Sequence, residues 1–468
     1  MSIRLMFVLF MSVFSKSIFA QSIFFETHFG NGMQDNARSV RELSDGTIYV
    51  AGYSDAGTNG SVDFTLTKLN KYGTPLWTHY YGDSLMNNCL YMTTTADSNF
   101  VLIGETETDS TGLDILLYKI DTTGKVMVKK QFSIKGNQSG KHILTYSDGG
   151  FVISGFNTDS SGTNNFYVIK TDSAGVIQWS TSLGSMDNDY VQMSKETPEG
   201  DILIVGDRKN PATQDYDLGL YKLSSSGNLI WEHTYGDTLN NGSQGILITS
   251  KNKYLIYGES EIFKSSPFDF TLELVDTNGT SIWKKAFGGT ISDAIFSATE
   301  TTDGGFICTG YSSSYSPGLD LVVLKTDSSG NLLWVHPYGS NGIDIGYDII
   351  PSIYGGFLIA GITSPEDGDF YLLHLDTGGL ISTIPEYTSS QIIIYPNPST
   401  GIVYMQMPDN SFENQIEIFD LCGKLVIKKS SHSPTIRIDL TNHANGLYLY
   451  TVTGKNGEII AGKIAVQH

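Results

Sequence analysis

The sequence predicts an all-β protein built from seven copies of one sheet module, because three residue series recur with a period of about 51 residues. A turn glycine recurs at Gly73, Gly124, Gly175, Gly227, Gly279, Gly330 and Gly379. A second glycine series consists of Gly52, Gly104, Gly155, Gly206, Gly258, Gly310 and Gly361. Ten residues before each turn glycine stands Asp63, Asp114, Asn165, Asp217, Asp269, Asp320 or Asp369. Three series with one period indicate a single structural unit repeated seven times.

Each copy reads as four short strands. In the sixth copy these are residues 294–299, 306–310, 320–325 and a strand around Trp334, joined by linkers rich in Asp, Ser and Gly. Such linkers are hairpin signals, because glycine tolerates positive φ and Asp or Ser side chains bond to their own backbone. A four-stranded sheet of this size cannot bury both faces alone, so the copies must pack face to face. Seven copies in a ring make a seven-bladed β-propeller, with six or eight blades as the alternative count.

The tryptophans indicate how the ring closes. All five stand four residues after a turn glycine, at Trp77, Trp179, Trp231, Trp283 and Trp334. The seventh copy has no such strand, but residues 24–30 near the N-terminus supply one. Phe25 and Gly30 keep the five-residue interval that separates Trp77 from Gly82. We therefore expect the first strand of the mature chain to complete the last blade and to remove the open sheet edges.

Residues 1–20 have the pattern of a secretory signal peptide, with Arg4, an apolar run over residues 5–14 and Ala20 before the expected cleavage point. A buried N-terminal strand is the alternative. The apolar run is too short for a permanent transmembrane helix, and no other stretch approaches 18 apolar residues. The mature chain is therefore expected to have no transmembrane segment.

Composition excludes several function classes. Against 29 basic residues stand 49 acidic ones, a net charge of −20, and a nucleic-acid-binding protein would need a basic face instead. The three cysteines, Cys89, Cys308 and Cys422, are too far apart to indicate a disulfide framework or a zinc site. Hydrophobic residues at 40% suffice for a large core, so the chain is not intrinsically disordered.

The repeat stops after about residue 383. Residues 384–393 form a polar linker, and residues 394–468 alternate apolar residues between turns, which predicts a small Ig-like β-sandwich. The positions that give this segment its character are Tyr395, Pro396, Asn397, Pro398, Gly401, Gly423, Gly446, Tyr448 and Lys463.

In order and spacing these segments resemble the type A C-terminal sorting domain of the type IX (Por) secretion system of Bacteroidetes. The resemblance implies passage through the periplasm, recognition by the outer-membrane translocon, and usually removal of the domain with attachment to surface lipopolysaccharide or release. An ordinary terminal Ig-like binding module is the alternative. Residues 22–383 also resemble the secreted β-propeller repeat of bacterial surface proteins, which implies a propeller but names no ligand. The expected domains are a signal peptide (1–20), a propeller (21–383), a linker (384–393) and a sorting domain (394–468).

The best candidates for ligand binding follow the second glycine series. In a four-stranded blade, the loop after the second strand and the loop before the first strand share one face, and these loops vary between copies. At one phase of the repeat that face presents Tyr53, Glu105, Phe156, Asp207, Glu259 and Tyr311. Aromatic rings there could stack on sugar rings, and carboxylates could accept hydrogen bonds from hydroxyl groups.

Metal sites are less well supported. The loops before the first strands carry Asp35, Asp189, Asp293 and Asp344, with Asn87 and Asn241 at the same phase, and such oxygens suit Ca²⁺. Residues that repeat at one phase usually cap their own loops, so we expect no cofactor and leave Ca²⁺ as the open alternative. His79, His233 and His336 each follow a tryptophan by two residues in different copies, so they cannot share a metal. The recurrent Lys68, Lys119, Lys170, Lys222 and Lys325 are expected to be solvated charges at strand ends.

No catalytic residue can be assigned from the sequence. Arg38, Arg41 and Arg208 would have to converge to clamp a carboxylate, and the odd spacing of Arg38 and Arg41 on one strand should turn them to opposite faces. Nucleophile-elbow, phosphate-loop and His-Glu-x-x-His motifs are absent from the sequence.

The sequence thus favours a secreted or surface-displayed propeller that binds an unknown glycan or protein without covalent chemistry. The main alternative is a polysaccharide-degrading lyase or hydrolase, with two loop-face carboxylates roughly 5–10 Å apart as acid and base. A structural surface-layer component is the third possibility, and it would self-associate.

Overall fold

The computed structural model describes an all-β chain that divides into two compact units, Met1–Ser382 and Thr383–His468. The signal-peptide prediction and residues 384–392 of the expected linker lie outside the described residues. The structure describes residues 24–30, 34–57, 61–108, 112–134, 136–184, 188–236, 238–261, 263, 266–315, 318–340, 342–364, 368–381, 393–397, 399–406, 414–420, 424–431, 433, 435–453 and 459–467.

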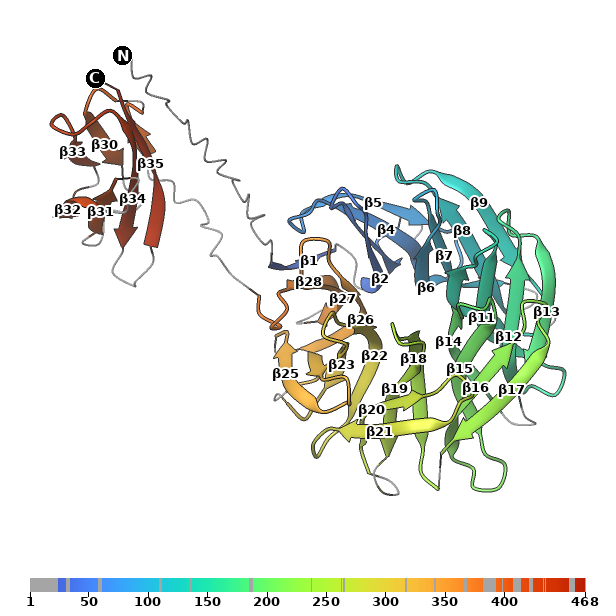
Figure 1. Ribbon diagram of the computed structural model, residues 1–468. Helices are drawn as coiled ribbons and strands as arrows, with labels where there is room; N and C mark the ends of the chain where they lie inside the picture. The colour runs from blue at the N-terminus through green and yellow to red at the C-terminus, as the bar shows by residue number, and fades with distance from the viewer. Residues whose placement is uncertain are drawn as a thin grey trace, which may run out of the picture. The chain divides into compact units, whose positions relative to one another are not determined.

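Within the described residues, the larger unit forms seven four-stranded antiparallel sheets (Figure 1). The first sheet contains β2 (Asn36–Glu42), β3 (Ile48–Ser54), β4 (Asp63–Leu69) and β5 (Pro75–Tyr81). The second contains β6 (Asn87–Thr94), β7 (Phe100–Thr108), β8 (Gly112–Ile120) and β9 (Val126–Phe132). The third contains β10 (Gln138–Thr145), β11 (Phe151–Thr158), β12 (Asn164–Thr171) and β13 (Ile177–Leu183).

The remaining sheets repeat this pattern. The fourth contains β14 (Tyr190–Glu196), β15 (Ile202–Lys209), β16 (Tyr216–Leu223) and β17 (Leu229–Tyr235). The fifth contains β18 (Asn241–Ile248), β19 (Tyr254–Glu261), β20 (Phe268–Val275) and β21 (Ser281–Phe287). The sixth contains β22 (Asp293–Glu300), β23 (Phe306–Ser312), β24 (Asp320–Thr326) and β25 (Leu332–Tyr338). The seventh contains β26 (Ile343–Pro351), β27 (Phe357–Ser364), β28 (Asp369–Leu375) and β1 (Phe25–Phe29).

The N-terminal strand completes the seventh sheet. β1 pairs antiparallel with β28, with Phe25 opposite His374 and Phe29 opposite Phe370. The expectation that the leading strand joins the last repeat is therefore confirmed. Both ends of the larger unit meet in one sheet, so β28 has a partner on each side.

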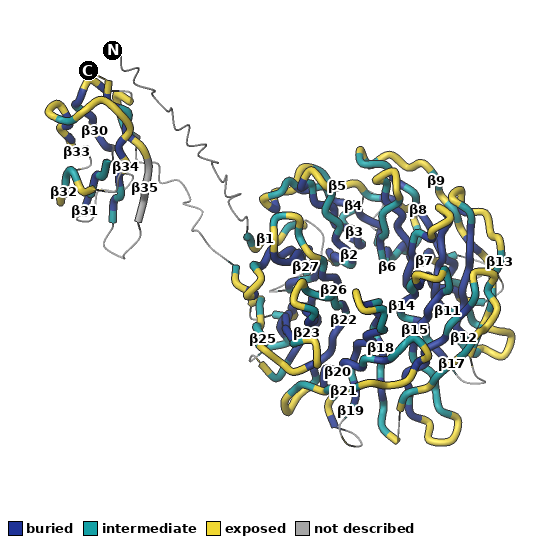
Figure 2. The backbone as a smooth tube through the Cα atoms, viewed as in Figure 1, coloured by how far each residue is buried: buried dark blue, intermediate teal, exposed yellow. Residues whose placement is uncertain are grey.

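Neighbouring sheets pack face to face and share hydrophobic cores. The first and seventh sheets do so as well, burying Val50 and Leu69 against Leu358 and Leu372, so the circuit of sheets closes. Figure 2 shows that the second and third strands of each sheet are mostly buried, whereas the fourth strands carry many exposed residues. Strands covered on both faces need nearly continuous apolar sequence, as in β24.

A contact between neighbouring sheets explains the repeat period. The turn glycine before each fourth strand lies against the fourth strand of the preceding sheet. Gly379 has φ +76°, and a Cβ there would lie 2.6 Å from the Trp334 ring. At the closure, a Cβ on Gly73 would lie 2.5 Å from the Phe25 ring, so Phe25 occupies the place that tryptophan holds elsewhere. A side chain at these positions would suffer both backbone strain and a clash.

Two of the recurrent lysines, Lys170 and Lys325, are only 1% and 6% exposed, so the expectation of solvated charges was wrong for them. Lys68, Lys119 and Lys222 are half-buried. The Lys170 Nζ lies 2.7 Å from Asp148 Oδ2, and the Lys325 Nζ lies 3.1 Å from Asp303 Oδ2. Each lysine reaches from the third strand to the aspartate of the turn between the first two strands and also donates to the carbonyl oxygen of the residue after it.

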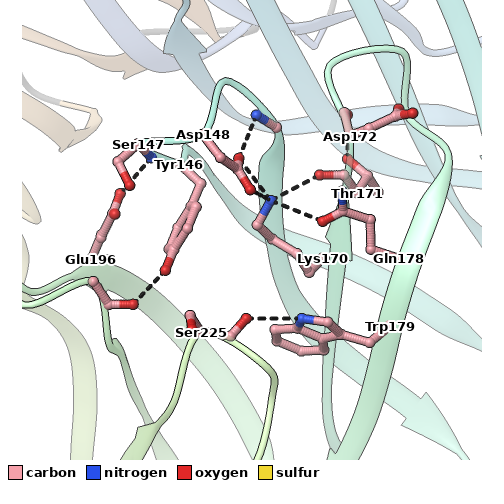
Figure 3. A network of polar contacts seen from close by, with 12 residues as sticks. Tyr146, Ser147, Asp148, Lys170, Thr171, Asp172, Gln178, Trp179, Glu196 and Ser225 are labelled. Carbon is pink, nitrogen blue, oxygen red and sulfur yellow. Dashed lines mark hydrogen bonds and ion pairs between the residues drawn. The ribbon is translucent and has the colours of Figure 1, made fainter.

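Polar contacts near Lys170 also join the third sheet to the fourth (Figure 3). The Trp179 indole N–H donates to the Ser225 carbonyl oxygen at 3.1 Å, and the Ser147 backbone N–H donates to Glu196 Oε2 at 2.8 Å. The Tyr146 hydroxyl donates to the Gly200 carbonyl oxygen. This face, which carries the short turns, is therefore occupied by structural bonds between sheets.

The histidines that follow tryptophans are also structural. His79, His233 and His336 lie in the first, fourth and sixth sheets, and each ring packs against the tryptophan two residues before it. The ring centroids of Trp77 and His79 are 4.6 Å apart. The three imidazoles therefore do not form a common site, as the repeat predicts.

The smaller unit is a two-layer β-sandwich. One sheet contains β29 (Ile393–Tyr395), β30 (Ile402–Gln406) and β33 (Thr435–Asp439). The other contains β31 (Asn414–Phe419), β32 (Leu425–Ser431), β34 (Gly446–Thr453) and β35 (Ile459–Val466). Val403 and Ile438 of the first sheet share a buried core with Ile418, Tyr450 and Ile464 of the second. Across the described parts of both units, we find no helix with the length and apolar character needed to cross a membrane.

Candidate functional site

The predicted ligand-binding residues lie near the axis of the circuit of sheets. The first strands of successive sheets contact one another and therefore line this axis (Figure 1). Each predicted residue lies near the end of a second strand, opposite the start of a first strand. Tyr53, for example, pairs with Asn36, and Asp207 pairs with Tyr190. All six predicted residues are half-buried.

A second set of axial residues escaped the sequence analysis. Each first strand contains a register shift that places one extra residue opposite the second strand, and such a bulge redirects its side chain. The seven residues are Arg38, Leu90, Lys141, Gln192, Gln244, Phe296 and Tyr347, all half-buried. Each stands fourteen residues before a glycine of the second series, as Arg38 does before Gly52, and this constant spacing could have revealed them. We call these seven residues and the six predicted ones the axial ring.

One arc of the axial ring is aromatic and cationic. The Arg38 guanidinium lies 3.9 Å from the centre of the Tyr347 ring and 5.5 Å from that of Tyr53. It also donates to the Tyr53 hydroxyl oxygen at 3.3 Å. Phe296 continues the arc, with its ring centre 5.3 Å from Tyr347 and 5.8 Å from Tyr311. The sixth, seventh and first sheets thus present a continuous set of rings with one cation among them.

The arc on the fourth and fifth sheets is acidic. Asp207 Oδ1 accepts hydrogen bonds from the Ser243 backbone N–H at 2.6 Å and the Ser243 hydroxyl at 2.9 Å, and Oδ2 accepts from Gln192 at 3.0 Å. Burial nevertheless raises the pKa of Asp207 to about 6. Burial raises the pKa of Glu259 to about 7, and the charge of Asp207 adds to that rise. Two carboxyl groups from adjacent sheets therefore titrate close to neutral pH.

The other two predicted residues make separate contacts. Glu105 accepts a hydrogen bond from the Asn88 side chain at 3.4 Å. Its charge also opposes the lowering of the Lys141 pKa that burial causes. The Phe156 ring meets the Tyr190 ring edge-on, with centres 5.9 Å apart.

Buried side chains fill the axis beside the ring. Asp348 Oδ2 lies 2.7 Å from the Arg41 Nη1 and accepts a hydrogen bond from Ser39 at 3.0 Å. The Arg41 guanidinium lies 5.1 Å from the Tyr91 ring centre, and the Tyr91 ring lies 4.2 Å from the ring of His142. Burial lowers the pKa of His142 well below its usual value. This chain of contacts links the seventh, first, second and third sheets.

The arginines differ from the sequence expectation in one respect. Arg38 contacts Tyr347 and Arg41 contacts Asp348, so both arginines reach toward β26 of the seventh sheet rather than to opposite sides of β2. The register shift between Ala37 and Ser39 resets the alternation of β2, which the sequence pattern could not show. Arg208 lies 3.8 Å from Glu232 on the outer strand β17, so the three arginines do not form one clamp.

Three of the residues weighed for Ca²⁺ accept hydrogen bonds from backbone N–H groups of their own sheet or of the loop that leads into it. Asp344 accepts from the Ser340 backbone N–H at 2.8 Å, and Asp293 accepts from that of Gly289 at 3.2 Å. Asp189 accepts from the Lys209 backbone N–H at 2.9 Å. Among the described residues, no three His, Cys, Asp or Glu side chains gather as a metal site requires.

The predicted sorting residues hold the C-terminal sandwich together where they are described. Asn397 donates to the Lys463 carbonyl oxygen at 3.1 Å and accepts from the Ala465 backbone N–H at 2.8 Å. Tyr448 is buried, and its hydroxyl donates to the Ala444 carbonyl oxygen at 2.7 Å.

The other sorting residues have the following positions. The exposed Tyr395 stacks on Tyr404 with ring centres 5.9 Å apart, next to Pro396. Gly401 donates to Ser399 Oγ at 2.9 Å, and Gly446 begins β34. Pro398 and Gly423 lie outside the described residues.

Comparison with known families identifies the C-terminal unit. Residues 393–467 match the secretion system C-terminal sorting domain. This domain belongs to type IX secretion, so the chain is exported to be displayed on the cell surface or secreted. The translocation machinery is accordingly a partner of the chain. The comparison with curated proteins found no match.

Several solved structures are similar to the chain at low sequence identity. PorZ of Porphyromonas gingivalis, described as an essential bacterial surface component of the type-IX secretion system, is 12% identical, with 94% of this chain and 60% of PorZ covered and a TM-score of 0.43. Polysaccharide lyase Uly1 is 9% identical, with 74% and 91% covered and a TM-score of 0.46. A puromycin hydrolase is 11% identical, with 89% and 58% covered and a TM-score of 0.48. The chain thus spans about three fifths of the length of PorZ.

Proposed function

We propose that this exported chain is a seven-bladed β-propeller with an Ig-like sorting domain, and that it acts as a binding or adhesion module for a glycan or protein at the cell surface. The seven four-stranded sheets and the packing of the first against the seventh support the propeller. In this proposal residues 1–20 are the signal peptide, 21–383 the propeller, 384–393 the linker and 394–468 the sorting domain.

The axial ring is the proposed binding site. The observation that carries this proposal is that the Arg38 guanidinium lies between the aromatic rings of Tyr347 and Tyr53. The axial ring also contains the carboxyl groups of Asp207 and Glu259. Sugars offer apolar C–H faces to aromatic rings and hydroxyl groups to carboxylates. Because the axial ring is half-buried and contains both aromatic and carboxyl groups, it suits a carbohydrate or a polar protein loop.

Binding can be tested with the full mature chain, residues 21–468, on glycan and host-protein arrays. Replacement of Tyr53 and Tyr311 by alanine, together with Glu105→Gln, should reduce binding to any hit at least tenfold, because it removes rings and a carboxylate of the axial ring. Tyr72→Ala is the matched control, because Tyr72 is 55% exposed beside a turn glycine on the opposite face. Binding that survives the triple variant but is lost in the control would place the site on the turn face.

A polysaccharide-degrading enzyme is the second candidate function, and the two acidic groups favour it. A glycoside hydrolase uses two carboxyl groups, one of them held protonated near neutral pH. Glu259 fits the protonated role because its pKa is raised to about 7, and its Oε2 makes no hydrogen bond within the described structure. Asp207 already accepts hydrogen bonds from Ser243 and Gln192. This arrangement is compatible with a structural link between the fourth and fifth sheets as well as with a catalytic base. Release of reducing ends or unsaturated products by the wild type, lost in Glu259→Gln, would establish this function.

Glu259→Gln should also change how stability depends on pH. Because the folded-state pKa is raised to about 7, the native state keeps a proton between about pH 4.5 and 7 that the unfolded chain releases. The free energy of unfolding of the wild type should therefore fall as pH rises through this window, by at most about 1.4 kcal/mol per pH unit from this group. Measured by urea unfolding, the free energy of unfolding should fall less between pH 5 and pH 8 in Glu259→Gln than in the wild type. Parallel curves for the two proteins would contradict the raised pKa.

A further inference from the structure

A hollow of about 420 Å³ opens between the third and fourth sheets, away from the axial ring. The strands β13 and β17, which bound it, lie side by side in Figure 1. Its volume is in the range of small-ligand sites, roughly 300–1,000 Å³. The residues that line it are Asn157, Asp159, Asn165, Ser182, Leu183, Gly184, Tyr221, Leu229 and Glu232.

The hollow exists because one residue breaks the repeat. Eight residues after the turn glycine, at the end of each fourth strand, the other sheets carry an aromatic side chain, and the third carries Leu183. The six aromatic counterparts are Phe29, Tyr81, Phe132, Tyr235, Phe287 and Tyr338. In the first sheet the Tyr81 ring fills this space, 5.7 Å from the ring of Tyr118 in the second sheet. Leu183 packs against the core that contains the corresponding Tyr221, but its side chain is smaller than an aromatic ring.

Tyr221 is part of the wall of this space. The residue is 1% exposed, and its ring packs against Phe166 with centres 5.1 Å apart. Its hydroxyl oxygen is buried, and the neighbouring Arg208 opposes the rise of the Tyr221 pKa that burial causes. The groups that can contact a ligand are therefore those of the neighbouring side chains.

Two amides add both donors and acceptors. The Asn157 Oδ1 accepts from the Ser182 hydroxyl at 3.3 Å, which points its NH₂ group to other acceptors. The Asn165 NH₂ donates to Asp159 Oδ2 at 3.4 Å, which leaves its carbonyl oxygen as an acceptor. Leu183 and Leu229 supply apolar surface beside these groups.

The two carboxylates of the hollow are already compensated. Asp159 Oδ1 accepts from the backbone N–H groups of Ser161 at 2.8 Å and Thr163 at 3.1 Å, which lowers the pKa of Asp159 together with the Ser161 hydroxyl. Glu232 lies 3.8 Å from the Arg208 guanidinium. Neither carboxylate therefore requires a cation, and both disfavour an anion. The groups that remain suit neutral hydroxyls.

We propose that the hollow between the third and fourth sheets is a second ligand site, which takes a neutral, hydroxyl-rich molecule of one or two sugar rings. The two amides hold the hydroxyl groups, and the leucines contact the C–H face. Asn157 follows Phe156 of the axial ring on β11, and the other lining residues lie outside the strands that carry the axial ring.

Saturation-transfer NMR on the full mature chain tests this site with glucose, galactose, mannose, N-acetylglucosamine and maltose as probes. We expect saturable binding of at least one probe by the wild type. Leu183→Tyr rebuilds the aromatic residue of the other sheets, so it should weaken binding at least tenfold without lowering the melting temperature. Leu76→Tyr is the matched control, because Leu76 is 56% exposed on β5, and it should bind as the wild type does.

Two further variants separate the possible outcomes. Asn157→Ala lies at the surface of the hollow and should also weaken binding, which keeps the test valid if Leu183→Tyr misfolds. Tyr72→Ala on the turn face, outside both proposed sites, should leave the binding unchanged. The proposal is overturned if no probe binds saturably, if Leu183→Tyr and Asn157→Ala bind like the wild type, or if methylammonium displaces the sugars.

Discussion

Replacement of Arg41 by methionine should lower the free energy of unfolding by about 3–5 kcal/mol, among the largest losses for a single substitution in this chain. The Arg41–Asp348 pair is 2.7 Å apart, and the side chain of Asp348 is only 6% exposed. Without the guanidinium, a buried carboxylate would lose its counter-charge at the point where the first and seventh sheets meet. The Arg41 guanidinium also donates to the Met92 carbonyl oxygen of the second sheet, so three sheets lose a shared contact.

Urea unfolding at pH 7 measures this effect, and two comparisons make it specific. The double variant Arg41→Met with Asp348→Leu should regain much of the loss, because removing both charges removes the uncompensated one. Arg437→Ala breaks an exposed pair with Asp439, also 2.7 Å apart, and should cost less than about 1 kcal/mol. An Arg41→Met variant as stable as Arg437→Ala would show that Asp348 does not depend on its partner.

The repeat predicted the architecture well because one contact recurs in each sheet. Six of the seven turn glycines lie against a ring of the preceding sheet, and Gly175 lies against Lys130, so the glycines and these outer-strand residues keep one period. Phe25 is recognisable as the closing residue because it keeps the five-residue interval to Gly30, and its pairing with His374 confirms that interpretation. Because the spacing recurs in each copy, a single sequence can reveal it.

The features that sequence missed depend on relations between strands or sheets. The bulge in β2 moves Arg38 and Arg41 to the axis, and no alternation pattern within one strand reveals a register shift with its neighbour. Lys170 looks solvated in sequence, because its partner Asp148 lies 22 residues earlier in the chain and only strand pairing brings the two together. The sequence shows that Leu183 is aliphatic at a position of the repeat where the other copies have an aromatic residue. Only the packing of the third and fourth sheets shows the hollow beside it.

Deletion of β1 should destabilise the larger unit more than any substitution outside the axis. β28 would lose the partner that pairs along Phe25–Phe29, and its edge would be free to pair with another chain. Phe25→Ala removes only the ring that covers Gly73 and meets His374 at 5.6 Å, so about 2 kcal/mol is expected for this half-buried side chain. Phe25→Trp, which copies the other sheets, should cost less than about 1 kcal/mol.

Urea midpoints and size-exclusion chromatography of the three variants test this order. The truncated chain should unfold at the lowest urea concentration and form dimers or larger species, and a peptide of residues 24–30 added in excess should restore the monomer. A truncated monomer with the wild-type midpoint would show that the seventh sheet needs only three strands.

Because Phe25 pairs with His374, almost the whole larger unit must be available before the circuit can close. Closure is therefore a contact of very high sequence separation, which makes it a late and slow step of folding. The peptide should accelerate this step when it is added during refolding of the truncated chain, because it supplies the fourth strand without the cost of closing the loop.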